Sequence, residues 1–261
     1  MDWNTYWRFE LLRRAADPLD FRQWKRDSQR ELKKLCPGRP LLLDSTAGLG
    51  DHTVNLAEEG FIVEACDDSD VALDATRRAV ADAGLDVRVF RARWEELGAA
   101  APERYDVVFN DALHWTYDEA ELRAALAGLF GALRPGGALV FFFADEREPE
   151  PQAGLRILEW DWSQIESERV VWDHALEGRR VTLTVVAERG PDFIDEHHLF
   201  LRREEDATAE LCRLTVRRVY RWDWHGIVPL LRDAGFTGMR SDHFENVKGH
   251  TFAMSRAFKP G

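Results

Sequence analysis

The chain has 261 residues, of which 45% are hydrophobic and 31% charged, and this balance predicts a globular protein with one large α/β domain or such a domain with a cap. Its formal net charge of −12 repels phosphate backbones, so we expect a small-molecule partner and no nucleic acid. The sequence shows neither a signal peptide nor a long apolar segment, and its three cysteines form no CxxC pair, so we expect a cytoplasmic protein without membrane contact, disulfide framework or metal site.

Residues 1–39 are rich in aromatic and basic side chains and are predicted to form two helices. The second helix begins near Asp17-Pro18, because proline is tolerated in a first turn, and Pro37-Gly38 ends the segment. Two interpretations of its tryptophans, among them Trp7, stay open. Either they cover one face of a sheet, or the segment is a lid that closes over a bound ligand.

The segment 41–50 reads LLLDSTAGLG and combines a strand, an acid and a glycine turn. An apolar run ends in Asp44, and Gly48 and Gly50 allow the backbone to turn sharply and to approach a ligand closely. A short helical pattern follows, and then a second strand that ends in Asp67. This order of strand, glycine turn, helix, strand and acid predicts the first half of a nucleotide-binding βαβ unit.

Two classes of cofactor fit this unit differently. A dinucleotide site favours a third glycine three residues after the second, but Thr53 occupies that position. The spacing of Asp44, Gly48 and Gly50 matches instead the acid, three residues and Gly-x-Gly of enzymes that bind S-adenosylmethionine (SAM). Asp67 offers two acceptor oxygens to the hydroxyls of a ribose, and the adjacent Asp68 is a further cofactor-binding candidate.

Trp94 is the candidate for contact with a nucleobase. A helix is predicted from near Ser69 to about Ala83, and a third strand covers 87–90. Trp94 follows just past the end of that strand, where ligands of α/β proteins bind, and its ring offers an apolar plate for stacking. The alternative is a surface tryptophan that packs on its neighbours.

The fourth predicted strand, 107–110, ends beside the glycine turn, across the switch point of the sheet. Asn110 and Asp111 are candidates to hold the ammonium group of a cofactor. His114 is the candidate to orient or deprotonate a nucleophile, because imidazole titrates near neutral pH. A hydrogen-bonded loop histidine is the alternative.

The rest of the chain first completes the alternating pattern and then departs from it. A helix over 118–133, a turn and an apolar strand over 138–143 complete the parallel part of the sheet. Half-polar strands then predict an antiparallel β cap inserted after strand five, and a helix with two antiparallel strands ends the chain. The predicted domains are an N-terminal arm at 1–39, a core at 40–153, the cap at 154–222 and the C-terminal part of the core at 223–261.

With these elements in order, the chain resembles the class I SAM-dependent methyltransferases, and among them the small-molecule N-methyltransferases of the glycine N-methyltransferase type. The resemblance is carried by the stretch 44–73, by Ala92-Arg93-Trp94 and by Arg134-Pro135-Gly136-Gly137. It implies a Rossmann-like fold with a mostly parallel sheet and SAM as the cofactor.

The resemblance also implies roles for single residues. Asp67 is expected to bind the ribose of SAM and Trp94 its adenine, while Thr46 and the two glycines of the turn contact the methionyl portion. Trp7 matches a family tryptophan in the segment that closes on the methionine part, and Arg93 stands where the family has an asparagine. The position of the family's glycine-binding arginine is occupied by Phe143-Ala144.

Three hypotheses for the function follow. The first is N-methylation of an amine or amino-acid-like metabolite, in which Trp115, Tyr220 and Trp222 surround a developing ammonium through cation–π contacts. The second is a natural-product O-methyltransferase that uses His114 as the base. The third is a non-catalytic protein with a SAM fold that binds partners through its acidic cap. The sequence is compatible with a homo-oligomer.

Overall fold

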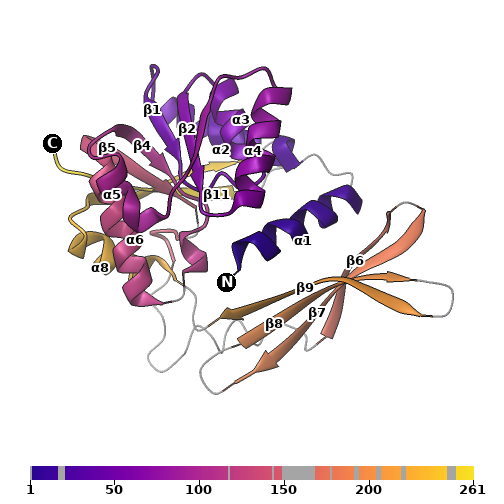
Figure 1. Ribbon diagram of the computed structural model, residues 1–261. Helices are drawn as coiled ribbons and strands as arrows, with labels where there is room; N and C mark the ends of the chain where they lie inside the picture. The colour runs from indigo at the N-terminus through magenta and orange to yellow at the C-terminus, as the bar shows by residue number, and fades with distance from the viewer. Residues whose placement is uncertain are drawn as a thin grey trace. The chain divides into compact units, whose positions relative to one another are not determined.

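The computed structural model describes residues 2–16, 21–116, 118–142, 144–148, 168–176, 178–190, 194–203, 207–218, 222–245 and 251–261 (Figure 1). The chain divides into two units. The smaller unit comprises Met1–Leu19 with Pro151–Arg221, and the larger comprises Asp20–Glu150 with Trp222–Gly261. Among the helices within the described residues, none is both long and apolar enough to cross a membrane.

A seven-stranded sheet forms the centre of the larger unit, with the strand order β10-β11-β5-β4-β1-β2-β3. The five strands that come first in the sequence, β1 to β5, run parallel. Strand β11 is antiparallel to β5, and β10 is antiparallel to β11. This mixed sheet confirms the predicted fold class. The strands are β1 (Leu41–Asp44), β2 (Ile62–Asp67), β3 (Arg88–Arg91), β4 (Tyr105–Phe109), β5 (Leu133–Phe141), β10 (Thr237–Glu245) and β11 (Thr251–Phe258).

Helices lie on both faces of this sheet, as right-handed crossovers between parallel strands require (Figure 1). Three of them begin at side chains that accept a hydrogen bond from the first turn: Ser69, Asp118 and Asp223. The helices of this unit are α2 (Phe21–Leu35), α3 (Asp51–Glu58), α4 (Asp70–Asp82), α5 (Leu97–Ala100), α6 (Glu119–Ala132) and α8 (Trp224–Asp233), with short 3-10 helices η1 (Trp94–Glu96) and η2 (Leu113–Trp115).

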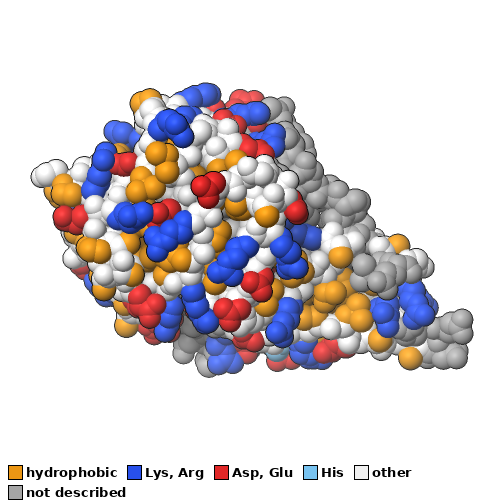
Figure 2. All heavy atoms as spheres, turned by 45° about the horizontal axis from the view of Figure 1, so that its top comes forward, with side chains coloured by type: hydrophobic (Ala, Val, Ile, Leu, Met, Phe, Trp, Pro, Cys, Tyr) orange, Lys and Arg blue, Asp and Glu red, His pale blue; other side chains and the backbone are white. Residues whose placement is uncertain are grey.

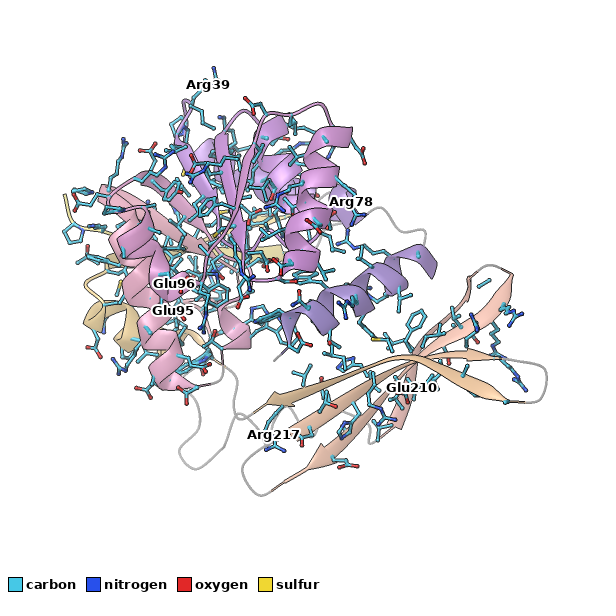
Figure 3. All side chains as sticks on the ribbon, viewed as in Figure 1. Arg39, Arg78, Glu95, Glu96, Glu210 and Arg217 are labelled. Carbon is cyan, nitrogen blue, oxygen red and sulfur yellow. The ribbon has the colours of Figure 1, made fainter. Side chains whose placement is uncertain are left out.

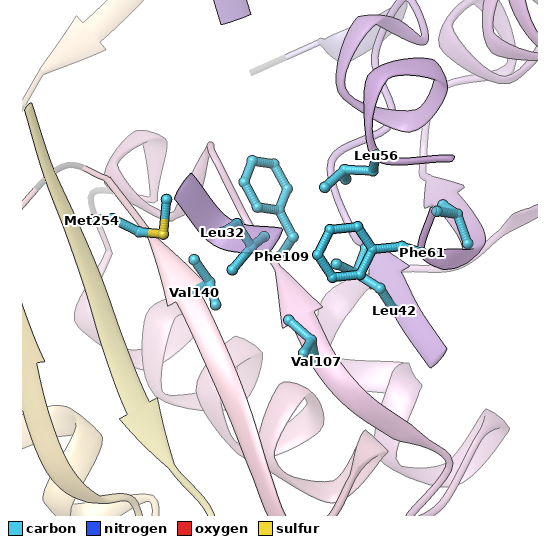
Figure 4. Packing of buried hydrophobic residues seen from close by; sticks show 9 residues of the cluster. Leu32, Leu42, Leu56, Phe61, Val107, Phe109, Val140 and Met254 are labelled. Atoms are coloured by element: carbon cyan, nitrogen blue, oxygen red, sulfur yellow. The ribbon is translucent and has the colours of Figure 1, made fainter. Parts of the chain in front are cut away.

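One hydrophobic cluster joins helices to the sheet (Figure 4). Leu32 of α2 and Leu56 of α3 are fully buried against strand residues such as Phe109. The continuous apolar sequence of these strands is therefore explained by burial on both faces. The other members are Leu42, Phe61, Val63, Val107, Val140 and Met254.

β5 begins at Leu133, earlier than the predicted start at 138. Leu133 pairs with Tyr105 of β4, and the register between the two strands then shifts before Val107 pairs with Ala138. The predicted turn at 134–137 lies inside the strand, where the amide of Gly136 donates to the carbonyl of Lys259 and the amide of Lys259 donates to Gly137. Gly136 has a φ of 78°, so the turn chemistry read from the sequence is present within the extended segment.

In its described residues, the smaller unit contains helix α1 (Trp3–Ala16) and a four-stranded antiparallel sheet with the order β6-β7-β8-β9. Phe9 of α1 is buried, and its ring lies 6.1 Å from the rings of Phe200 and His198. The opposite face of the sheet carries polar pairs, such as Arg217 with Asp195 at 2.6 Å. The strands are β6 (Glu168–Leu176), β7 (Arg179–Arg189), β8 (Ile194–Arg203) and β9 (Thr208–Arg218).

The surface charges of the described residues are mixed. Figure 2 shows Lys and Arg side chains interspersed with Asp and Glu side chains over the visible face. The larger unit also contains ion pairs, such as Arg26 with Glu58 at 2.9 Å and Arg123 with Asp233 at 2.7 Å. The chain's basic residues on this face are thus spread among carboxylates.

Glu64 of β2 is the centre of a buried polar cluster away from the glycine turn. Its carboxylate accepts a hydrogen bond from the Tyr105 hydroxyl at 2.8 Å and also contacts Arg104 and Arg88. Burial raises the pKa of Glu64, but the hydrogen bonds from Arg104 and Tyr105 outweigh burial and bring the pKa below its usual value. Burial and the neighbouring Glu64 raise the pKa of Tyr105, so its hydroxyl stays a donor.

We expect Tyr105→Phe to lower the free energy of unfolding by about 1.5–3 kcal/mol, because a hydrogen bond to a charged acceptor is lost inside the fold. Urea denaturation with an unchanged m-value measures this loss. The same substitution in a Glu64→Gln background should cost less, since the acceptor is then neutral. Equal stability of Tyr105→Phe and the natural protein would contradict the expectation.

Candidate cofactor and acceptor site

The glycine turn between β1 and α3 requires two residues without side chains. Gly48 and Gly50 have φ values of 54° and 88°, in the left-handed region that other residues rarely adopt. A Cβ atom at Gly50 would also lie 2.9 Å from the Cβ of Ala79 in α4. The turn therefore depends on glycine both for its backbone conformation and for the packing of α3 on α4.

Asp44 stabilises this turn from inside the protein. Its side chain is fully buried, and it accepts hydrogen bonds from the amide of Thr46 at 3.2 Å and from the hydroxyl of Thr53 at 2.6 Å. Burial raises the pKa of Asp44, and its hydrogen-bond donors and His52 act in the opposite direction. The structure thus places Asp44 beneath the turn, where it shapes the backbone that faces a ligand.

Asp67, at the end of β2, lies beside the turn with acceptor capacity remaining. Its Oδ2 accepts the amide of Gly48 and its Oδ1 accepts the amide of Ser69, both at 3.0 Å. A carboxylate has about four lone-pair positions, so each oxygen can accept a further donor from a ligand. Burial raises the pKa of Asp67 to about 6. Asp68 is half-buried at the same edge, ahead of the Ser69 that caps α4.

Trp94 begins η1 and points its indole toward the end of β1. Its Nε1 donates to the carbonyl of Ser45 at 2.7 Å, so the half-buried ring lies next to the glycine turn. The side chain of Arg93 is instead 62% exposed, and its guanidinium lies 2.9 Å from the carboxylate of Glu95. Of this pair, the structure therefore brings Trp94 to the site and leaves the Arg93 side chain in solvent.

A glycine in α6 fixes the position of η1. A Cβ atom at Gly128 would lie 2.0 Å from the carbonyl oxygen of Trp94 and 2.8 Å from the Cα of Glu95, so only glycine fits there. Figure 3 shows Glu95 and Glu96 beside α6. The close approach of two backbones thus sets the height of the Trp94 ring over the sheet edge.

Asn110 and Asp111, the polar residues that follow β4, differ in burial and in hydrogen-bond partners. Asn110 is fully buried, and its amide donates to the hydroxyl of Ser45 at 2.9 Å while its carbonyl oxygen accepts the amide of Ala112 at 2.9 Å. Asp111 is different, because its side chain is 38% exposed. The amide of Asp111 donates to the hydroxyl of Thr46 at 3.2 Å, which ties the end of β4 to the glycine turn.

His114 and Trp115 lie in η2, directly after these residues. Both are half-buried, and their rings are 5.4 Å apart. His114 is near enough to Asp111 for its charge to lower the pKa of that carboxyl. Trp222 is buried, with its indole nitrogen donating to the carbonyl of Thr116 at 2.5 Å. Tyr220 lies outside the described residues.

His52 was not predicted as part of the site. It lies two residues after Gly50, in the first turn of α3, and its Nε2 is 3.0 Å from Oδ2 of Asp111. The sequence offered one signal, a histidine inside the glycine motif, but the partner carboxylate is far along the chain. Trp7 belongs to the smaller unit, where its ring lies 4.9 Å from that of Tyr6.

Together these groups form a series along one edge of the parallel sheet. In the order of the strands, Trp94 follows β3, Asp67 ends β2, the glycine turn follows β1 and Asp111 follows β4. The edge therefore presents an aromatic ring, an acceptor for hydroxyls, a bare backbone turn and a carboxylate. Among the residues described, no group of three or more His, Cys, Asp or Glu has the arrangement of a metal site.

Comparisons with known proteins agree with this geometry. Residues 42–137 match the family model described as a methyltransferase domain. A glycine/sarcosine N-methyltransferase of Halorhodospira halochloris is 33% identical over 113 residues, which are 42% of this chain and 41% of that protein. A ubiquinone biosynthesis O-methyltransferase of Saccharophagus degradans is 33% identical over 110 residues, 42% of this chain and 45% of that protein. The chain spans about half the length of the curated relatives it matches.

Among solved structures, the fold is similar to that of SAM-bound CalS10, an amino pentose methyltransferase of Micromonospora echinaspora. The TM-score is 0.67, and the alignment covers 96% of each chain. At 19% sequence identity, this likeness shows the fold alone.

Proposed function

Because the chain belongs to the class I SAM-dependent methyltransferases, we propose that it transfers a methyl group from SAM to the nitrogen of an amine or amino-acid-like small molecule. When bound, SAM supplies an activated methyl group on a sulfonium, so the protein mainly aligns the acceptor and excludes water. The observation that carries the proposal is the series of groups along the edge of the sheet, from Trp94 to Asp111.

These groups fit SAM in chemistry and in order. The ring of Trp94 offers a surface for the adenine, and the remaining acceptor positions of Asp67 suit the ribose hydroxyls. Gly48 and Gly50 leave room for close backbone approach of the methionyl part, and the hydroxyl of Thr46 lies beside them. The exposed carboxylate of Asp111 suits the ammonium group.

The acceptor is proposed from relatives and from the groups after β4. Two of the similar proteins are named for amine-bearing substrates, a glycine/sarcosine N-methyltransferase and an amino pentose methyltransferase. An amine attacks once it is neutral, whereas a hydroxyl needs a base at the moment of attack. The ubiquinone relative supports O-methylation as the second candidate, and His114 is the base we propose for it.

We expect the protein to release S-adenosylhomocysteine when SAM is incubated with small amines such as glycine, sarcosine or an amino sugar, and not with a catechol. In that case His114→Ala should change the rate by less than about tenfold, because proton removal from an ammonium can occur before attack. A general base contributes roughly 10²–10⁴-fold, so a loss of that size with a hydroxyl acceptor would favour O-methylation. SAM binding without turnover of any acceptor would favour the non-catalytic alternative.

Several sequence-based expectations remain predictions. They are the lid role of 1–39 with Trp7, the aromatic contacts of Trp115, Tyr220 and Trp222 with the acceptor, a homo-oligomeric state, a cytoplasmic location and the lack of a nucleic-acid partner.

A further inference from the structure

His52 is a buried histidine whose two ring nitrogens both have side-chain partners. It is 6% exposed, and its ring lies 4.8 Å from that of Phe109. Nε2 lies 3.0 Å from Oδ2 of Asp111, and Nδ1 contacts Nε2 of Gln29, a residue of α2 that is 1% exposed. The chain of contacts therefore runs from the interior of α2, through α3, to the edge of the sheet.

The direction of these hydrogen bonds can be assigned. Nδ2 of Asn55 donates to Oε1 of Gln29 at 3.5 Å, which leaves the amide nitrogen of Gln29 facing His52. An amide nitrogen only donates, so Nδ1 of His52 accepts. The single proton of a neutral imidazole then resides on Nε2 and is donated to Asp111. With the amide of Asn55 oriented as in the structure, the opposite orientation of Gln29 would set two donors against each other.

These contacts leave one carboxylate oxygen of Asp111 hydrogen-bonded to His52 and the other oxygen available to a ligand. Oδ2 accepts from His52, whereas Oδ1 has no hydrogen-bond partner among the residues that the structure describes. Burial raises the pKa of Asp111, but the hydrogen bond from His52, with the nearby Lys25 and His114, outweighs burial and holds the pKa below its usual value. Oδ1 thus belongs to an ionised and oriented carboxylate, on a side chain that is 38% exposed.

We infer that Gln29 and His52 form a positioning relay that aims Oδ1 of Asp111 at the positive charge on the amino-acid end of SAM. The inference rests on the proposed function, which places that end of the cofactor after β4. It assigns Gln29 of α2 a part in the site that acts through His52 and Asp111. His52 acts through Asp111 and is a positioning residue.

Calorimetric titration with S-adenosylhomocysteine and 5′-methylthioadenosine tests the relay without turnover, because the two thioethers differ in the amino-acid moiety. We expect Asp111→Asn and His52→Phe each to weaken S-adenosylhomocysteine binding by about fivefold or more, with methylthioadenosine affinity changed by less than about twofold. His52→Phe keeps an aromatic ring against Phe109 and removes the donor to Asp111. His52→Gln restores a donor and should recover most of the affinity.

A double-mutant cycle shows whether His52 acts through Asp111. Adding His52→Phe to Asp111→Asn should weaken S-adenosylhomocysteine binding little further. The matched control is His225→Phe, since His225 is a half-buried histidine that bonds the carbonyl of Glu148 at 2.9 Å, and it should change neither affinity. Additive losses, or equal losses for both ligands in His52→Phe, overturn the relay. Failure of the natural protein to bind S-adenosylhomocysteine overturns the cofactor site itself.

Discussion

Replacing Asp67 with asparagine should weaken SAM binding by about 1–3 kcal/mol at pH 7.5, or roughly 5- to 150-fold in Kd. The carboxylate already accepts the amides of Gly48 and Ser69, and it has acceptor positions left for two ribose hydroxyls. An asparagine side chain has a single acceptor oxygen, so at least one of the ligand's hydroxyls loses its partner. Calorimetry with SAM measures the change.

The pH dependence of binding provides an independent check. The pKa of Asp67 is raised by burial to about 6, and donors from the ribose favour the ionised form. The affinity of the natural protein should therefore be constant above pH 7 and fall by up to about tenfold for each pH unit below 6. The affinity of Asp67→Asn should lack this decline. Parallel pH profiles for the two proteins would remove Asp67 from the binding site.

The same substitution should not destabilise the free protein at neutral pH. The pKa of Asp67 in the folded state lies above the value of 3.8 for an unperturbed carboxyl, so its ionisation costs stability as the pH rises from 3.8 to 6, and the cost is constant above 6. Asparagine removes that cost, but its NH2 group replaces an oxygen that accepts the amide of Gly48 or Ser69, so the two effects oppose each other. A thermal midpoint close to that of the natural protein would separate loss of ligand contacts from loss of folding.

Gly128→Ala should lower the free energy of unfolding by about 3 kcal/mol or more and weaken SAM binding as well. The added methyl carbon would lie 2.0 Å from the carbonyl oxygen of Trp94, so either α6 or η1 has to move. Because the indole of Trp94 bonds Ser45 at the glycine turn, movement of η1 displaces the ring that is proposed to contact adenine. Chemical denaturation and SAM titration measure the two effects.

The sign of the stability change distinguishes a steric clash at Gly128 from the effect of helix propensity. Glycine to alanine inside an exposed helix stabilises by about 1 kcal/mol through helix propensity alone, so an unclashed Gly128→Ala would gain stability. Gly84→Ala serves as the control, because it adds the same methyl group with nothing within 4 Å and costs only the strain of a φ of 65°. SAM affinity should be unchanged in that variant. A stabilised Gly128→Ala would refute the proposed contact.

The sequence was sufficient for the parts of the site that depend on local order. The strand, the glycine turn, α3 and the acid at the end of β2 lie within a short stretch, and each has its own residue signature in Asp44, Gly48, Gly50 and Asp67. The antiparallel strands of the smaller unit were recognisable from their alternation and turn residues. The parallel core followed from alternating strands and helices.

Contacts between distant residues could not be predicted in this way. His52 and Asp111 are 59 residues apart, and nothing in a single sequence pairs them. Gly128 reads as a weak helix residue until the structure places the η1 backbone against it. The hydrogen-bond partners of Asn110 could not be predicted either. An asparagine at the end of a strand can bond a ligand or a residue of the protein, and the outcome depends on neighbours such as Ser45.

Helix α1 packs on strands that are translated much later, and this order has a consequence for biosynthesis. The ribosome releases α1 before these strands, yet the ring contacts of Phe9 with His198 and Phe200 need strands whose sequence begins at Glu168. Translation proceeds at roughly 5–20 residues per second, so this helix waits for many seconds with its apolar side unmatched. The smaller unit can therefore form only after β9 has been translated, and a chain stopped before β6 exposes an aromatic helix to chaperones or to aggregation.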